Sequence, residues 1–204
     1  MAFGTYGSVL ISYSFKPFGE SSANHNPVDD GLLTWAASIG AIVNGCMRII
    51  FGNLVDVYSF RSLMTILLAL ELVLCSVFYF AAHSPSIFFA CIMMNYIVLG
   101  GFFTIMPVSV TRVFGLKQGP QVYVQISMGS FFACLLNLIT TKWVLPSTGY
   151  LTLYILGAAL TFVALVNVYL IEEKLDVSRL NKKGALIAVN ESEPQEHKTK
   201  SIDS

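Results

Sequence analysis

The chain has 204 residues, of which 55% are apolar and only 12% are charged, and its mean hydropathy is +0.68. Soluble domains carry about 25% charged residues, so this composition excludes an ordinary water-soluble fold and predicts a protein that lies in a lipid bilayer. Twelve basic and twelve acidic residues give zero net charge, which removes any general electrostatic argument for nucleic-acid binding.

Charged and turn-forming residues divide the chain into apolar runs, each of which predicts a membrane span of roughly 20 residues. The first run, 1–15, is uncharged but short for a crossing, so we expect the first helix to be truncated at its front. The later spans are predicted at 32–55, 63–82, 86–110, 122–141 and 150–171. Together they predict an all-α, polytopic transmembrane bundle of six helices over residues 1–171.

Basic residues beside the spans predict the orientation. If the C-terminal tail is cytoplasmic, only two basic residues lie outside, Lys16 and Lys142. The inner side then holds Arg61, Arg112, Lys117, Lys174, Arg179, Lys182 and Lys183. This bias predicts a multi-pass membrane protein with its tail inside. The tail, 172–204, is rich in Lys, Glu and Ser and is expected to be disordered, and its sequon at Asn190 is expected to be unused.

Neither a metal site nor an enzyme is predicted. The cysteines stand singly inside apolar runs, at Cys46, Cys75, Cys91 and Cys134, with no C-x-x-C pair. The three histidines fall in polar connecting or tail segments. No Ser/His/Asp set or carboxylate pair lies within a span, so the sequence predicts no cofactor and no catalytic residue.

Two full charges lie deep inside predicted spans, Arg48 and Glu71. Each costs on the order of 2.5–3.5 kcal/mol at the centre of a membrane helix and therefore needs a partner, a cavity or a function. Arg48 precedes Asp56 by eight residues and Glu71 follows Leu63 by eight, so on antiparallel neighbouring helices both would lie about 12 Å from the cytoplasmic end. One interpretation is an ion pair that locks the two helices together. In the other, Arg48 binds a substrate carboxylate with Asn44, one turn earlier, addressing the same volume.

The loop after the second predicted span carries a recognisable motif. Gly52, Asp56 and Arg61 resemble the G-x-x-x-D-x-x-G-R loop signature of the major facilitator superfamily. Phe60 and Ser62 replace the usual glycine and second basic residue of that signature. The resemblance implies a transporter of twelve helices in two halves.

Further residues resemble one branch of that superfamily. Arg48, four residues before the loop glycine, resembles the substrate-facing arginine of the monocarboxylate transporters and of the related oxalate–formate antiporters. Asn44 stands where the proton-coupled carriers have an aspartate, which favours the antiporter-like branch. Residues 100–107 (GGFFTIMP), followed by Phe114, are similar to a run of that branch. The antiporters' second substrate-binding cation, a lysine, has no counterpart in 122–141.

The resemblance covers about residues 3–171 and corresponds to helices seven to twelve, so the chain is expected to be a C-terminal fragment of such a carrier. It implies alternating-access transport of small organic anions that bind Arg48 and Asn44 in the bilayer. The partner implied is an N-terminal six-helix half or a second copy. A different class stays open: a non-transporting six-helix membrane scaffold or regulatory subunit, in which Arg48 and Glu71 serve only as structural contacts.

The same resemblance implies a cytoplasmic gate made by Gly52, Asp56, Arg61 and Arg112. Asp56 is expected to pair with Arg61 or Arg112 and to accept hydrogen bonds from the N-terminus of the helix near Val122. This cluster would hold the inner gate shut.

Overall fold

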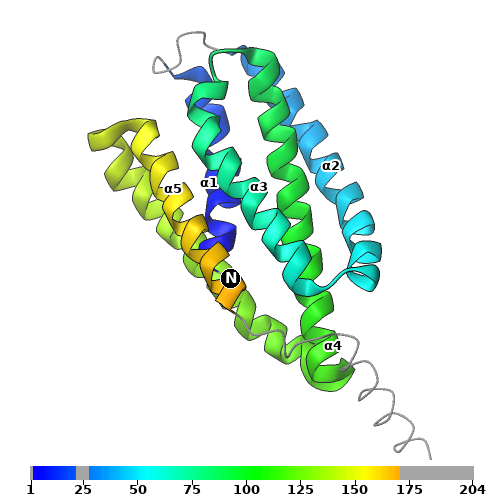
Figure 1. Ribbon diagram of the computed structural model, residues 1–204. Coiled ribbons are helices and arrows are strands. Elements are labelled where there is room, and N and C mark those ends of the chain that lie inside the picture. Colours follow the sequence, from blue (N-terminus) through cyan, green and yellow to red (C-terminus); the bar gives the residue numbers. More distant parts are fainter. Residues whose placement is uncertain (1, 22–27, 171–204) are drawn as a thin grey trace, which may run out of the picture.

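The computed structural model describes residues 2–21 and 28–170 and has no strand within them, so the predicted all-α fold is confirmed. The elements are α1 (Ala2–Glu20), α2 (Asp30–Val57), α3 (Phe60–Ala81), α4 (Pro85–Ile139), the π-helical turn η1 (Thr140–Val144) and α5 (Leu145–Leu170) (Figure 1). The predicted tail 172–204, including Asn190, lies outside the described residues.

Single glycines break two of the helices, α4 and α5. Gly115 (φ 77°, ψ 168°) divides α4, and Gly149 (φ 79°, ψ 174°) lies near the start of α5. Only glycine adopts such angles readily, because a Cβ would clash with the backbone. The described residues therefore form six helical segments, and Figure 1 shows the two arms of α4 meeting at a sharp turn.

In the described part of the chain, three stretches are long and apolar enough to cross a membrane: Asp30–Val57, Phe60–Ala81 and Pro85–Leu170, the last of which contains both glycine breaks. The remaining helix, α1, continues past the predicted end at residue 15, through Lys16 and Pro17, to Glu20. Its 19 residues extend about 28 Å, close to the roughly 30 Å of a hydrocarbon core. The first helix is therefore longer than its uncharged run predicts.

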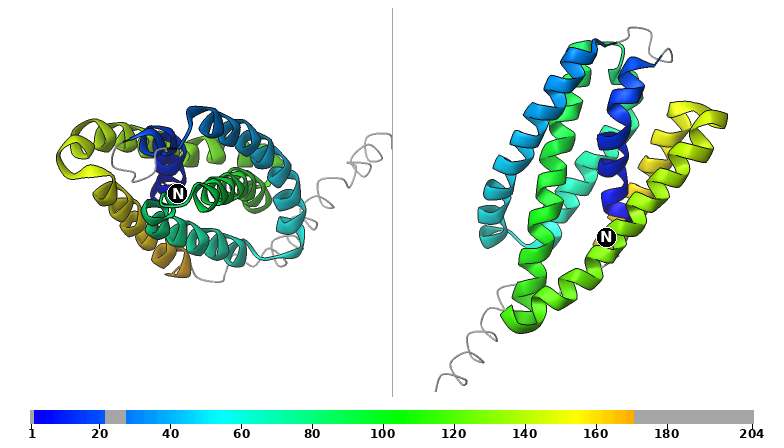
Figure 2. Two further views of the ribbon diagram at one scale, coloured as in Figure 1. Left: turned by 90° about the horizontal axis from the view of Figure 1, so that it is seen from above. Right: turned by 180° about the vertical axis from the view of Figure 1, so that it is seen from behind.

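The helix α1 lies at the centre of the packing. It contacts both α4 and α5, and Figure 2 shows it between the two arms of α4. Helix α2 packs on α4, whereas α3 packs on α5 and α4 rather than on α2. The helix that precedes α3 in the chain is therefore not its main neighbour.

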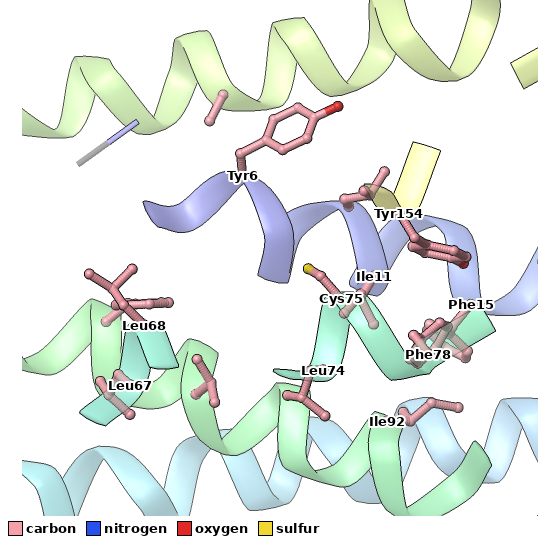
Figure 3. Packing of buried hydrophobic residues seen from close by; sticks show 14 of the residues in the cluster. Tyr6, Ile11, Phe15, Leu67, Leu68, Leu74, Cys75, Phe78, Ile92 and Tyr154 are labelled. Carbon is pink, nitrogen blue, oxygen red and sulfur yellow. The ribbon is translucent and has the colours of Figure 1, made fainter. Parts of the chain in front are cut away.

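Aromatic side chains from four helices pack together at the end of the bundle where α1 and α3 end. The ring of Phe18 lies 4.9 Å from that of Tyr150 and 5.5 Å from that of Tyr154, and the rings of Phe78 and Phe88 lie 5.0 Å apart (centroid distances). All but Tyr150 are fully buried, and Figure 3 shows Phe78 and Tyr154 in this packing. Each aromatic pair contributes about 0.5–1.5 kcal/mol beyond burial, so this end is a firmly packed part of the bundle.

Candidate functional site

Asn44 and Arg48 lie together on α2, as their spacing of one turn predicts. Arg48 Nε donates a hydrogen bond of 3.2 Å to Asn44 Oδ1, and Asn44 Nδ2 donates one of 3.1 Å to the backbone oxygen of Tyr96 on α4. Both ends of the Asn44 amide are therefore used. Through these two hydrogen bonds, Asn44 links the Arg48 side chain to the backbone of α4.

The Arg48 guanidinium lies on an exposed part of α2 and over the ring of Phe103, with 5.4 Å between Cζ and the ring centroid. Among the described residues, no acidic side chain pairs with it, and its Nη1 and Nη2 atoms make no hydrogen bond. Phe103 is absent from the predicted site, although it lies within 100–107. Sequence spacing does not tell which neighbouring helix a residue of that run faces.

Glu71 does not pair with Arg48, so the ion pair that is one of the two interpretations of these charges is not formed. The Glu71 side chain is fully buried, and its carboxyl accepts hydrogen bonds from Ser8 on α1 and Cys75 on α3, whereas Arg48 is exposed on α2. The physical reason is rotational. Helix α3 packs against α5 and α4 rather than α2, so Glu71 faces Ser8 on α1 instead of α2.

The acidic residue of the predicted gate pairs with one of its two expected partners. Arg112, near the end of the first arm of α4, forms an ion pair with Asp56 through Nη2 and donates a 2.6 Å hydrogen bond from Nη1 to the backbone oxygen of Val55. The Arg112 guanidinium therefore binds both the Asp56 side chain and the backbone of the last turn of α2. It does so three residues before the backbone break at Gly115.

Arg61, the other expected partner of Asp56, contacts Tyr169 instead. Its Nη2 donates a 2.8 Å hydrogen bond to the backbone oxygen of Tyr169, and its Cζ lies 4.9 Å from the centroid of the Tyr169 ring. It therefore connects the start of α3 to the end of α5. Gly52 faces α4, where a Cβ would lie 3.9 Å from Thr104 Cγ2, and so belongs to the α2–α4 contact.

The expected contact between Asp56 and a helix N-terminus near Val122 is also not formed. The hydrogen bond that the structure gives Asp56 comes from Arg112. The second arm of α4 begins directly after Gly115, so Val122 lies inside a helix, where backbone N–H groups are bonded within that helix.

No group of three or more His, Cys, Asp or Glu side chains that could hold a metal ion occurs in 2–21 and 28–170. The four cysteines are free.

In a comparison with known protein families, the family model of the Major Facilitator Superfamily matches residues 1–201. No curated protein matches the chain. The family match includes every helix of the described structure, the Asn44–Arg48 pair and the Asp56–Arg112 pair.

Proposed function

The chain belongs to the Major Facilitator Superfamily, a family of transmembrane transporters, and we propose that it carries small organic anions, of the monocarboxylate or oxalate and formate type, by alternating access. The observation that carries this proposal is the exposed Arg48 guanidinium, which is supported at Nε and has free Nη1 and Nη2 atoms among the described contacts. A planar guanidinium binds a carboxylate with two parallel hydrogen bonds, which gives both affinity and a defined orientation.

The surroundings of Arg48 support the same role. The Asn44 oxygen occupies Nε, and the Phe103 ring lies against the guanidinium, so the outer edge with its two terminal nitrogens remains for a ligand. A cation over an aromatic face gains about 0.5–1 kcal/mol at an exposed site, which favours one orientation of the side chain. A carboxylate would meet a guanidinium that is already positioned, so less entropy is lost on binding.

A single cation at the site favours an anion with one carboxylate bound at a time. The second substrate-binding cation of the antiporters, a lysine, has no counterpart in 122–141, and Arg48 has no basic neighbour among its described contacts. We therefore expect formate-sized and larger monocarboxylates to bind at least as well as dicarboxylates.

Because Arg48 is exposed, a second protein unit could pack against this face of α2. In transporters of this architecture the substrate lies near the midplane between two helical bundles that move around it. We propose that a second six-helix bundle, either an N-terminal half or a second copy of this chain, covers the Arg48 face. With that bundle in place, the anion would be enclosed from two sides.

The Asp56–Arg112 pair is suited to the proposed cytoplasmic gate. It lies where α2 ends and α4 turns, and its side chains are partly exposed. Exposed ion pairs contribute only about 0–1 kcal/mol, so such a contact forms and breaks at little cost during each transport cycle. The bond from Arg112 to Val55 adds to the closed state.

Uptake into proteoliposomes tests the proposal. The full chain, reconstituted with and without a candidate N-terminal half, is assayed with radiolabelled formate, acetate and oxalate. Arg48→Ala should lower uptake on the order of ten- to a hundred-fold, since a hydrogen bond to a charged group contributes about 1.5–3 kcal/mol. Arg48→Lys should retain part of the activity, because it keeps the charge but loses the planar fork.

Lys142→Ala is the matched control, because Lys142 is also an exposed basic residue but lies on η1, away from α2. Its uptake should equal that of the parent. Normal uptake by Arg48→Ala would remove Arg48 from the anion site. If the inserted parent takes up none of the anions alone or with the second bundle, the scaffold interpretation is favoured instead.

A further inference from the structure

A second polar site lies inside the bundle, away from the Arg48 face. Glu71 on α3 is 0% exposed and is enclosed by α1 and α5. Figure 3 shows Cys75, one turn further along α3, directed at α1. The anion site described above uses none of these residues, so Glu71 needs its own explanation.

Polar atoms from three helices converge on the Glu71 carboxyl. Ser8 Oγ on α1 donates a 2.6 Å hydrogen bond to Oε2, and the Cys75 thiol lies 3.6 Å from Oε1. A Cβ placed on Gly7 would lie 2.6 Å from Glu71 Oε1, 2.9 Å from Cys75 Sγ and 2.9 Å from Thr161 Oγ1 on α5. The Glu71 carboxyl, the Cys75 thiol and the Thr161 hydroxyl therefore all lie next to Gly7, where the Cβ of any other residue would clash with them.

Among residues 2–21 and 28–170, none of the groups that face Glu71 carries a positive charge. Helix α1 contributes the Ser8 hydroxyl, α3 the Cys75 thiol and α5 the Thr161 hydroxyl. Helix α4 reaches the cluster through Asn95, which is fully buried and whose Nδ2 donates to the backbone oxygen of Ser8. The ion pairs in the described part of the chain lie elsewhere, at partly exposed positions.

An ionised carboxylate in such a place is expensive, because neutral hydrogen-bond donors replace only part of the hydration that it loses. A protonated carboxyl avoids this cost and has one O–H to donate as well as lone pairs to accept. Ser8 supplies a donor for Oε2. The Thr161 hydroxyl donates to the backbone oxygen of Gly157 at 2.9 Å, which leaves lone pairs on Thr161 to accept.

We propose that Glu71, Ser8, Cys75 and Thr161 form an intramembrane proton-binding site whose bound proton keeps α1 packed on α3 and α5. A sodium ion is the competing ligand. It would need several more oxygen ligands than the cluster offers, and the thiol is a poor ligand for a hard cation. A proton needs none beyond those already present.

The site links protonation to helix packing. Glu71 has no exposed atom, so loss of the proton leaves a charge that water can reach only if α1 separates from α3 and α5. The proton therefore favours the packed arrangement over one in which α1 has moved. Solvation of α1 should accordingly depend on pH through Glu71.

Infrared difference spectroscopy of the full chain in lipid nanodiscs tests the proton directly. At neutral pH the parent should show the carbonyl stretching band of a protonated carboxyl, and Glu71→Gln should lose it. Glu20→Gln, which changes an exposed glutamate at the end of α1, is the matched control and should keep the band. A parent without the band, or a band that persists in Glu71→Gln, overturns the proposal. So does a band that disappears when sodium replaces choline, since that assigns the site to a cation.

Ser8→Ala provides a second variant if Glu71→Gln does not fold. Loss of the Ser8 donor should shift the band while leaving its intensity, and an unchanged band would remove Ser8 from the site. Hydrogen exchange tests the link to packing. After correction for the intrinsic rate, exchange in α1 should rise with pH in the parent but not in Glu71→Gln, a permanently neutral side chain of similar shape. Identical pH dependence in both proteins overturns the proposed coupling.

Discussion

A Cβ added at Gly100 would lie 2.9 Å from the backbone oxygen of Asn44, so α2 and α4 cross at this point with no room for a side chain. Four residues earlier on α4, the backbone oxygen of Tyr96 accepts the hydrogen bond from Asn44. The same helix contact therefore sets the position of Asn44 and, through it, that of Arg48.

Gly100→Ala is expected to destabilise the protein, because the obstacle is backbone and cannot rotate away. Overpacking of this kind costs roughly 1–3 kcal/mol. Thermal denaturation in detergent should show a lower midpoint than the parent. Gly45→Ala is the control, since a Cβ at Gly45 meets nothing within 4 Å. That variant should be neutral or stabilising by up to about 1 kcal/mol, because alanine favours helix. Equal midpoints for the two variants would contradict the close crossing.

The helices themselves follow from the sequence, because in a bilayer an apolar run without charge has to satisfy its backbone groups internally. The residues at which the helices begin and end are predicted less accurately. The predicted spans 86–110 and 122–141 leave a connection of eleven residues, whereas the backbone breaks only at Gly115. Hydropathy marks where apolar residues stop, and the polar segment around Lys117 and Gln118 continues as helix outside that apolar run.

Spacing alone predicts side-chain partners only where they lie on one helix, whereas the Asp56–Arg112 pair between α2 and α4 is one of the two pairings that the family resemblance implies. The Asn44–Arg48 contact follows from i,i+4 geometry. The partners of Glu71 could not be predicted, because spacing in the sequence gives the position of a residue along its helix but not the neighbouring helix that its side chain faces. Arg61 is a similar case. Its partner is a backbone oxygen near the end of α5, which no motif marks.

Arg112 should stabilise the C-terminal end of α2 more than Asp56 does. Asp56→Asn removes only an exposed ion pair, so hydrogen exchange at the end of α2 should rise by no more than about fivefold, corresponding to about 1 kcal/mol. Arg112→Ala also removes the donor to Val55 and should produce a larger rise. The double variant Asp56→Arg with Arg112→Asp should restore only the ion pair. An equal rise for the two single variants would show that the Val55 contact contributes nothing.

Tyr6 should stabilise the contact between α1 and the π-helical turn. Its hydroxyl and Thr140 Oγ1 share a 2.8 Å hydrogen bond, and the Tyr6 side chain is fully buried. Tyr6→Phe should cost about 0.5–1.5 kcal/mol, because one buried hydrogen bond is lost while the ring remains. Tyr13→Phe on the same helix is the control, since Tyr13 is 71% exposed and should tolerate the change. Chemical denaturation of the two variants in parallel measures the difference.

Asn44→Asp should weaken anion binding more than Asn44→Ala does. Both variants lose the donor to Tyr96, and both therefore loosen the support of Arg48. The aspartate adds a carboxylate within reach of the guanidinium, where it forms an internal ion pair that competes with the substrate. Competition of unlabelled formate against labelled uptake should give the lowest apparent affinity for Asn44→Asp, an intermediate one for Asn44→Ala and the highest for the parent. If Asn44→Asp binds as tightly as Asn44→Ala, the anion does not use the Arg48 charge at this place, and the proposed site on α2 is wrong.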